Sequence, residues 1–531
     1  MKRTPLNRSE LSTLAGTAAL LLGLAVVSRV FYPLAQLDEA AYRSFSITFG
    51  ALRTSKLLVL VLAPAAVVVW LRRDQRWTHL AEGHRLRLLV LATAGSLVVS
   101  LAFYEPNWFF GQSHLVDRVL LVGLFALSFR WPIALVPFTV LAGVIISQFA
   151  VPLGRYSWTG DRLVFDLVIL FCLAAGAGIL RGREGLRVLI GATGVLVVSW
   201  YLVAGVGKIA LLWPGRQELA NMTRSAHLSG WLTADTASRL ADLVAGLNWL
   251  LVPAAIAVEV TALLMMLGRR PALAVLVALP GLHLSVFLLS GLFFWKWMIL
   301  EAALLVFVLR CDRDVFASFG PALVLLALPF VALSPRLFGV SNLAWYDTPY
   351  TVRIALEAVG ESGTAYRVDP DDLAPYEMLL ALGRLGFLAK PGILVGSHGA
   401  AVDWNVASRI NQARSLDDLS KVESEFAVSQ YQEDDSLVFD RFVRARFDQW
   451  VDQPPLRPPH HVWTGRAPAF LNMPPVSFAG QEEVAEVRVR MLKVWWDGQR
   501  YRLLADCIIR VVPMTETAGP SYVAPATACA L

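Results

Sequence analysis

The feature that most constrains this chain is a series of apolar runs that fills its first two-thirds. An α-helix needs about 20 apolar residues, within a range of roughly 17 to 25, to cross the hydrocarbon core of a bilayer. Candidate spans lie at 11–30, 57–71, 86–103, 115–128, 132–150, 163–180, 187–207, 245–267, 272–289, 295–310 and 320–334. The pattern predicts a polytopic α-helical membrane protein with about 11 spans. The runs stop near residue 335, so a water-soluble part is expected after it.

Composition agrees with this interpretation. Charged residues make up 17% of the chain, whereas soluble proteins average about 25%. The net charge of +6 is better interpreted loop by loop than as a signal for nucleic-acid binding, which we do not expect. The first apolar run is long for a signal peptide and no A-x-A cleavage site follows it, so we interpret it as the first membrane helix.

Basic residues predict the orientation, because short cytoplasmic loops are enriched in lysine and arginine. They cluster before the first span and in alternate short loops, at 2–8, 72–87, 130, 181–187, 269–270 and 310–313. The N-terminus is therefore expected inside, and an odd number of spans places the residues after Pro335 outside. We expect a multi-pass protein of the cell (inner) membrane, with a transmembrane domain at 1–335 and an extracytoplasmic domain at 336–531.

The C-terminal part shows mixed helix and strand patterns that predict an α+β domain. Helical spacing is present at 370–389, 415–432 and 436–451, and a proline-rich linker follows at 452–463. Alternating apolar and polar residues flank Asp497-Gly498, which predicts a long β-hairpin with a two-residue type I′ turn. An amphipathic interfacial helix is expected within 229–247, starting at Thr233 or Asp235.

The chain has four cysteines, and none of them has the C-x-x-C spacing of a zinc or thioredoxin-like site. We therefore predict no metal site from the cysteines. Cys507 and Cys529 can pair in an oxidising compartment.

Ionisable residues inside predicted spans are candidate functional groups, because burying a charge in a bilayer is costly. They are Lys208, Glu259, His283, Lys296 and Glu301. Lys208, Lys296 and Glu301 are expected toward the outer leaflet with His283 somewhat deeper, so that they can converge on one cavity open to the outside. Structural alternatives remain for each group: Lys208 can extend to the headgroups, His283 can be a satisfied core residue, and Glu259 can be paired or protonated.

Desolvation lowers the pKa of a lysine, and a neutral amine can act as a general base. A carboxylate beside the lysine opposes that shift. The positions of Glu259 and Glu301 therefore decide the role of Lys208, and the sequence does not give them.

Three segments, 201–208, 251–267 and 282–305, resemble the HTTM domain, the membrane domain shared by vitamin K-dependent γ-glutamyl carboxylase and its bacterial relatives. The matching positions are Tyr201, Ala204, Gly205, Lys208, His283, Ser285, Gly291, Phe293 and Phe294. The resemblance covers about residues 100–310 and implies that Lys208 is a base acting on a reduced quinone. The Asn-Asn-His stretch of the carboxylase is missing from the corresponding residues 157–166, so the resemblance predicts a position and not the carboxylation reaction.

The resulting hypothesis is an HTTM-like membrane enzyme acting on a lipid- or quinone-like substrate. Catalytic roles are expected for Lys208, His283 and Glu301, and binding roles for Tyr201, Glu259 and Lys296. Two alternatives remain open. Asp38 and Glu39 lie in the first outer loop and are similar to the acidic motif of GT-C glycosyltransferases, which use lipid-linked sugars. The chain can also be a non-catalytic subunit whose outer domain binds a partner protein.

Overall fold

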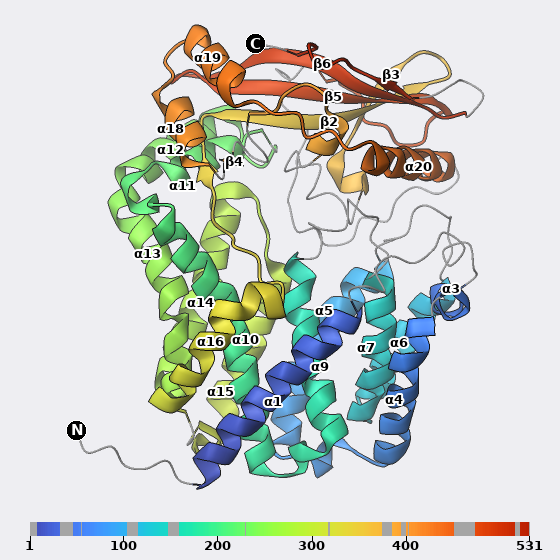
Figure 1. The fold of residues 1–531 in the computed structure, drawn as a ribbon, viewed down its shortest axis with the longest axis vertical. Coiled ribbons are helices and arrows are strands. Elements are labelled where there is room, and N and C mark those ends of the chain that lie inside the picture. The colour runs from blue at the N-terminus through green and yellow to red at the C-terminus, as the bar shows by residue number, and fades with distance from the viewer. Residues whose placement is uncertain are drawn as a thin grey trace.

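The protein is mostly helical and carries an antiparallel sheet near its C-terminus, as a computed structural model shows (Figure 1). The structure describes residues 8–31, 46–54, 56–103, 115–146, 159–228, 230–316, 319–373, 385–394, 400–401, 403–450, 473–515 and 521–529. The predicted proline-rich linker at 452–463, most of the predicted helix at 370–389, and the acidic pair Asp38 and Glu39 lie outside these residues.

Every apolar run expected to span the membrane coincides with a helix. In chain order these helices are α1 (Arg8–Phe31), α4 (Lys56–Arg72), α5 (Gly83–Phe103), α6 (Leu115–Ser128), α7 (Leu135–Ile146), α9 (Thr159–Ala177), α10 (Arg183–Ala210), α13 (Asn248–Thr261), α14 (Arg269–Ser290), α15 (Trp295–Arg310) and α16 (Pro321–Leu337). A short helix, α3 (Ile47–Thr54), precedes α4, and a 3₁₀ segment at Ala262–Leu267 extends α13.

Five of the described helical segments are long and apolar enough to cross a membrane. They are Arg8–Arg29, Gly83–Ala102, Arg183–Ala210, Asn248–Leu267 and Arg269–Ser290. Three shorter apolar helices, Val59–Arg72, Pro132–Ile146 and Pro321–Leu337, accompany them. The chain is therefore compatible with a membrane protein, whereas the count of about 11 spans and the N-in orientation remain predictions.

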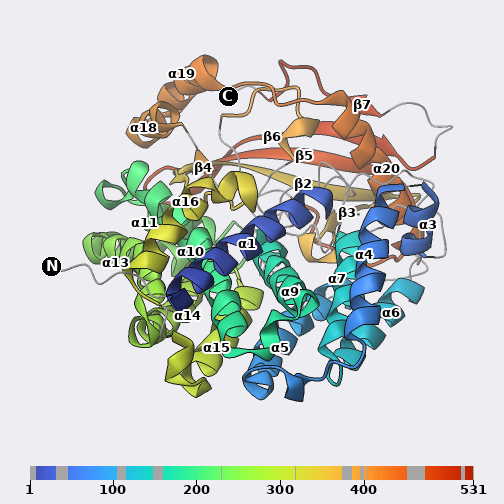
Figure 2. The same cartoon turned by 60° about the horizontal axis from the view of Figure 1, so that its bottom comes forward.

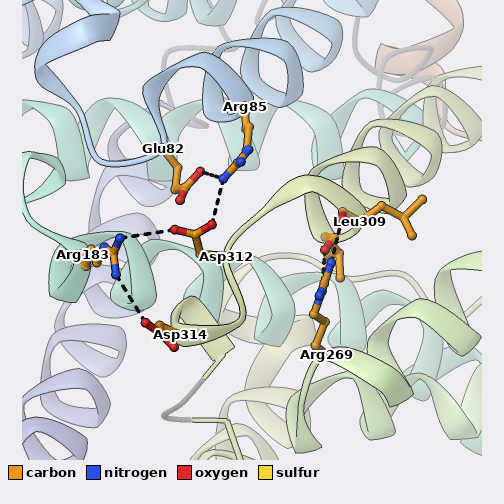
Figure 3. A network of polar contacts seen from close by, with 8 residues as sticks. Glu82, Arg85, Arg183, Arg269, Leu309, Asp312 and Asp314 are labelled. Carbon is orange, nitrogen blue, oxygen red and sulfur yellow. Dashed lines mark hydrogen bonds and ion pairs between the residues drawn. The ribbon is translucent and has the colours of Figure 1, made fainter.

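The loops that were predicted to be basic and cytoplasmic come together in space. Asp312 lies 3.4 Å from Arg85 and 3.3 Å from Arg183, and Arg183 also lies 3.4 Å from Asp314 (Figure 3). Arg269 donates to the main-chain oxygens of Val308 and Leu309 at the end of α15. In Figure 1 the sheet lies over one end of the bundle, and the N-terminal end of α1 lies at the opposite end.

The sheet has five strands in the order β3-β2-β5-β6-β7, and all of its neighbouring strands are antiparallel. Its strands are β2 (Tyr350–Gly360), β3 (Ala365–Val368), β5 (Val484–Trp496), β6 (Tyr501–Pro513) and β7 (Tyr522–Val523). A separate two-stranded sheet pairs β1 (Tyr346–Asp347) with β4 (Ala400–Ala401). The predicted long hairpin is confirmed as β5 and β6, with Trp496 opposite Tyr501.

The predicted two-residue turn of this hairpin is wrong. Four residues, 497–500, connect β5 to β6, and Gly498 has a φ of +98°. The Asp497 carboxylate accepts hydrogen bonds from the main-chain N–H groups of Gln499 and Arg500, both at 2.9 Å. This side-chain capping stabilises a wider turn than the Asp-Gly pair alone would favour.

Helices cover one face of the sheet. These are α19 (Leu416–Phe426) and α20 (Glu433–Trp450), so the helices predicted within 415–432 and 436–451 are confirmed, whereas α18 (Trp404–Gln412) contacts β1, β4 and α19. Arg510 of β6 is buried against α20 in a bidentate pair with Asp440, with distances of 2.6 and 2.7 Å. Figure 2 shows α18 and α19 beyond the strands, away from the helical bundle. Cys507 and Cys529 form a disulfide at this end of the protein.

The longest predicted outer loop contains two helices, α11 (Glu218–Ser225) and α12 (Ala234–Gly246). The predicted amphipathic helix is confirmed as α12, and its N-cap is Thr233, whose hydroxyl accepts from the Thr236 N–H. The sequence analysis did not predict α11. We call the segment from α11 to α12 the outer hairpin. Leu228, within it, packs against Leu492 and Val494 on the sheet face opposite α19 and α20.

Candidate functional site

Lys208 lies in the last turn of α10, and its side chain turns into the protein. Its Nζ is 2.6 Å from Oε1 and 2.8 Å from Oε2 of Glu259 on α13. Both residues are buried, with 8% and 7% of their surface exposed. The lysine therefore does not simply extend to solvent or headgroups, because a carboxylate within the bundle compensates its charge.

A glycine makes this approach of α10 and α13 possible. A Cβ at Gly205 would lie 3.0 Å from the Glu259 Cβ and 3.0 Å from a Val260 methyl, so any larger side chain would push the helices apart. Gly207, one turn from the end of α10, has the side chain of Asn342 directly against it. Asn342 belongs to the segment that connects α16 to β1. We call this segment the linker from here on, and it is distinct from the proline-rich segment at 452–463.

The turn after α10 covers Lys208, and the linker is bonded to that turn. The ammonium lies 5.3 Å from the ring centroid of Trp213, a distance suited to a cation–π interaction. The Trp213 indole N–H donates a 2.7 Å hydrogen bond to the main-chain oxygen of Trp345. The Lys208–Glu259 pair is thus connected, through Trp213, to the chain that leads into the sheet.

A second polar group lies about two turns deeper along α10. The Tyr201 hydroxyl donates a hydrogen bond to Oε1 of Glu301 on α15. Nδ1 of His283 on α14 lies 3.0 Å from the same oxygen. The ring is not oriented for a hydrogen bond, so this contact is one of distance and charge. Glu301 thus joins three helices and is itself 1% exposed.

Aromatic rings surround His283 on several sides. Its ring centroid lies 5.2 Å from Phe294, 5.5 Å from Trp297 and 5.7 Å from Tyr201. Trp297 also packs edge-on against Trp200, at 5.4 Å. Such a setting excludes water and strengthens the electrostatic interaction between the imidazole and Glu301. We call Tyr201, His283 and Glu301, with these rings, the aromatic cluster.

The residues expected to share one cavity therefore fall into two neighbouring groups. Lys208 pairs with Glu259, and His283 and Tyr201 contact Glu301. The two groups also interact electrostatically, because the charge of Glu259 acts on both His283 and Tyr201.

Lys296 is 1% exposed in the first turn of α15, and its ammonium lies 5.3 Å from the Trp295 ring. The contacts that Trp213, Trp297 and Asn342 make with these groups were not apparent from the sequence pattern.

A small apolar cavity lies between α5, α9, α10 and α15. It has a volume of about 20 Å³, and Leu300, the neighbour of Glu301, forms part of its wall with Thr93, Thr193 and Leu189. A space of this size holds about one water molecule. Among the described residues, no group of three or more His, Cys, Asp or Glu side chains is arranged to hold a metal ion.

Comparisons with known proteins return no relative. The chain matches no family model. It also matches no curated protein and no solved structure at a significant level. The resemblance to the HTTM domain accordingly remains a prediction from the quoted motifs, and the function must be argued from the site itself.

Proposed function

We propose that the chain is an integral membrane enzyme whose aromatic cluster performs acid–base chemistry on a lipid- or quinone-like substrate. The observation that supports this proposal is the contact of His283 and Tyr201 with one buried carboxylate, Glu301, on three separate apolar helices. Ionisable groups are costly inside an apolar bundle, and they are retained there mainly where they serve a function. This proposal keeps the HTTM-like expectation and shifts the proton-transfer role from Lys208 to His283.

The chemistry follows from the positions of the three groups. A carboxylate near Nδ1 favours the tautomer that carries its proton on that nitrogen, which leaves Nε2 of His283 as a proton acceptor. Glu301 also stabilises the imidazolium that forms when Nε2 takes a proton. Tyr201, hydrogen-bonded to the same oxygen, fixes the orientation of the carboxylate.

Lys208 has a different role in this proposal. The ammonium of Lys208 donates to both oxygens of the Glu259 carboxylate, so the lysine is engaged in an ion pair rather than free to act as a base. We assign the Lys208–Glu259 pair to positioning α10 against α13, next to the aromatic cluster. A substrate that displaced Glu259 would release the amine for chemistry.

Two further features, the disulfide and the clustered arginines, support an extracytoplasmic location for the sheet. Disulfides persist in oxidising compartments, and Cys507–Cys529 lies at the sheet end of the molecule. The clustered arginines of Figure 3 lie in the loops that the positive-inside rule assigns to the cytoplasm. We therefore propose the N-in, C-out orientation in the cell membrane, with membrane lipids as the surrounding partners.

Untargeted mass spectrometry of lipids and quinones tests the function. Membranes containing the wild type, Glu301→Gln or His283→Asn are extracted and compared, together with the lipids that copurify with each protein in nanodiscs. Ser285→Ala serves as the control, because Ser285 is exposed on α14 two residues after His283 and bonds only to its own helix. We expect the amount of at least one lipid or quinone species to change in membranes that contain the wild type or the control. The amount of that species should stay constant in membranes that contain either site variant.

The alternatives give different results in the same assay. Loss of the change in Asp38→Asn, with Glu301→Gln unaffected, would favour a glycosyltransferase of the GT-C class. Profiles that are identical for all variants at equal membrane levels would contradict an enzymatic role and favour a subunit that binds a partner protein.

A further inference from the structure

Two buried acids meet where the outer hairpin contacts the chain entering the sheet. Oε2 of Glu218, at the start of α11, accepts a 2.6 Å hydrogen bond from the main-chain N–H of Asp347 in β1. Asn221, one turn further along α11, donates to the main-chain oxygen of Asp347 at 2.9 Å. Both acids are 1% exposed. The helical bundle is therefore joined to β1 by bonds on both sides of one residue.

The side chain of Asp347 is incompletely satisfied. Its Oδ2 accepts a 3.0 Å hydrogen bond from the indole of Trp345, while Oδ1 has no partner among the described residues. A buried ionised oxygen without a partner is costly, so a neutral Asp347 fits this site better than an ionised one. Glu218, which receives a main-chain N–H, is the acid of this pair that ionises more easily.

The charged and titratable groups around the pair have mixed signs. Arg216 interacts favourably with Glu218, and its guanidinium lies over the rings of Tyr346 and Trp404. Asn221 of α11 and Tyr501 of β6 interact with Asp347, and the other polar groups of the surrounding elements are Arg224 of α11, Asp242 of α12, Asn248 of α13, Asp403 before α18 and Arg353 of β2. From α14, the apolar Leu289 packs near this hairpin.

We propose that Glu218 and Asp347 form a proton-dependent latch that holds the outer hairpin on β1 when Glu218 is neutral and loosens when Glu218 ionises. The latch is attached to the linker that bonds to Trp213 over Lys208, because Trp345 contacts both Asp347 and Trp213. Opening it therefore frees the linker above the Lys208–Glu259 pair. This inference concerns the extramembrane junction and does not depend on the proposed enzymatic activity.

The direction of the pH response follows from burial. Burial raises the pKa of Glu218 from 4.5 to about 7, against the opposing effects of the Asp347 N–H and Arg216. Burial likewise raises the pKa of Asp347 well above its usual range, and the charge of Glu218 adds to this. The closed latch thus holds a proton that the open form releases. Its stabilisation is complete below the usual pKa of a glutamate and is lost as the pH rises through about 7.

Hydrogen–deuterium exchange of the full-length protein in nanodiscs tests the latch. The readout is the protection of the Asp347 amide, which donates to Glu218, at pH 5 and pH 8 after correction for the intrinsic rate. We expect wild-type protection to fall by up to roughly 100-fold between the two conditions. In Glu218→Gln, an amide oxygen still accepts the bond but cannot ionise, so the fall in protection should be much smaller than in the wild type, with Asp347 as the remaining titrating group.

Two further variants separate the latch from its neighbours. Asp242→Asn alters a carboxylate that pairs with Arg224 on the same hairpin, and it should keep the wild-type response. Asp347→Asn keeps the amide that donates to Glu218, and it should keep a clear response because Glu218 still titrates. The proposal is overturned if wild-type protection does not change with pH, if Glu218→Gln responds as strongly as the wild type, or if Asp347→Asn abolishes the response.

Discussion

Lys208 holds both carboxylate oxygens of Glu259, at 2.6 and 2.8 Å, across the contact between the last turn of α10 and the second half of α13. The two residues are 51 positions apart in the chain. Because both side chains are largely buried, each is the main compensation for the charge of the other. The pair therefore determines how these two helices pack.

Glu259→Gln should destabilise the protein strongly. Removing one partner of a buried ion pair leaves an uncompensated charge and costs about 3–5 kcal/mol. Thermal unfolding in detergent should show a clear fall in Tm, with Thr261→Ala, an exposed position two residues away, as the control. The double variant Lys208→Met with Glu259→Leu should recover most of the loss. A double variant as unstable as Glu259→Gln would show that the pair is not the source of the effect.

Tyr201→Phe should separate orientation from stability in the aromatic cluster. It removes the hydrogen bond to Glu301 but keeps the ring contacts with His283 and Trp297. A hydrogen bond to a charged group contributes about 1.5–3 kcal/mol, so the protein should stay folded. Loss of the copurifying lipid or quinone, with a moderate fall in Tm, is the expected outcome. Unchanged ligand retention in Tyr201→Phe and Glu301→Gln would contradict the assignment of this cluster.

Gly205→Val should disrupt the α10–α13 contact. Its side chain would collide with Cβ of Glu259 and with Val260, and overpacking of this kind costs about 1–3 kcal/mol. Gly281→Ala provides the matched control, because a Cβ there meets nothing within 4 Å in the middle of α14. Thermal stability should fall for the first variant and stay equal or rise for the second. Equal stability of both would mean that the two helices do not need this close approach.

Maleimide labelling should detect the Cys507–Cys529 disulfide. Of the four cysteines, Cys507 and Cys529 are paired while Cys172 and Cys311 are free. Protein isolated from membranes and denatured without reductant should take up two labels, and after reduction it should take up four. Uptake of four labels before reduction would contradict the disulfide and the oxidising compartment. Removing the bond by Cys529→Ser should cost about 3 kcal/mol.

The sequence predicted local structure well where one segment carries the whole signal. Apolar runs identified the helices, a threonine cap identified the start of α12, and alternation identified the β5–β6 hairpin. The turn was mispredicted because the Asp497 carboxylate bonds to two main-chain N–H groups ahead of it. That contact depends on side-chain geometry rather than on the Asp-Gly pair.

The partners within the site were beyond the reach of the sequence. Spacing shows which residues of one helix share a face, but it does not show which other helix packs there. Tyr201 and Glu301 are 100 residues apart, and Glu259 was as suitable a partner for His283 as Glu301 was. The identity of the candidate residues was therefore predictable, whereas their division between Lys208–Glu259 and the aromatic cluster required the fold.

The order of the strands has a consequence for how the chain assembles. The centre of the sheet pairs β2 with β5, which closes a loop of roughly 120 residues, and closure of long loops slows folding. Apolar helices that are close to each other in the chain can pack together much earlier than the sheet can form. We therefore expect β2, already in place beside the outer hairpin, to remain unpaired on its β5 side until β5 has been synthesised. The helical bundle would then act as the template on which the sheet forms.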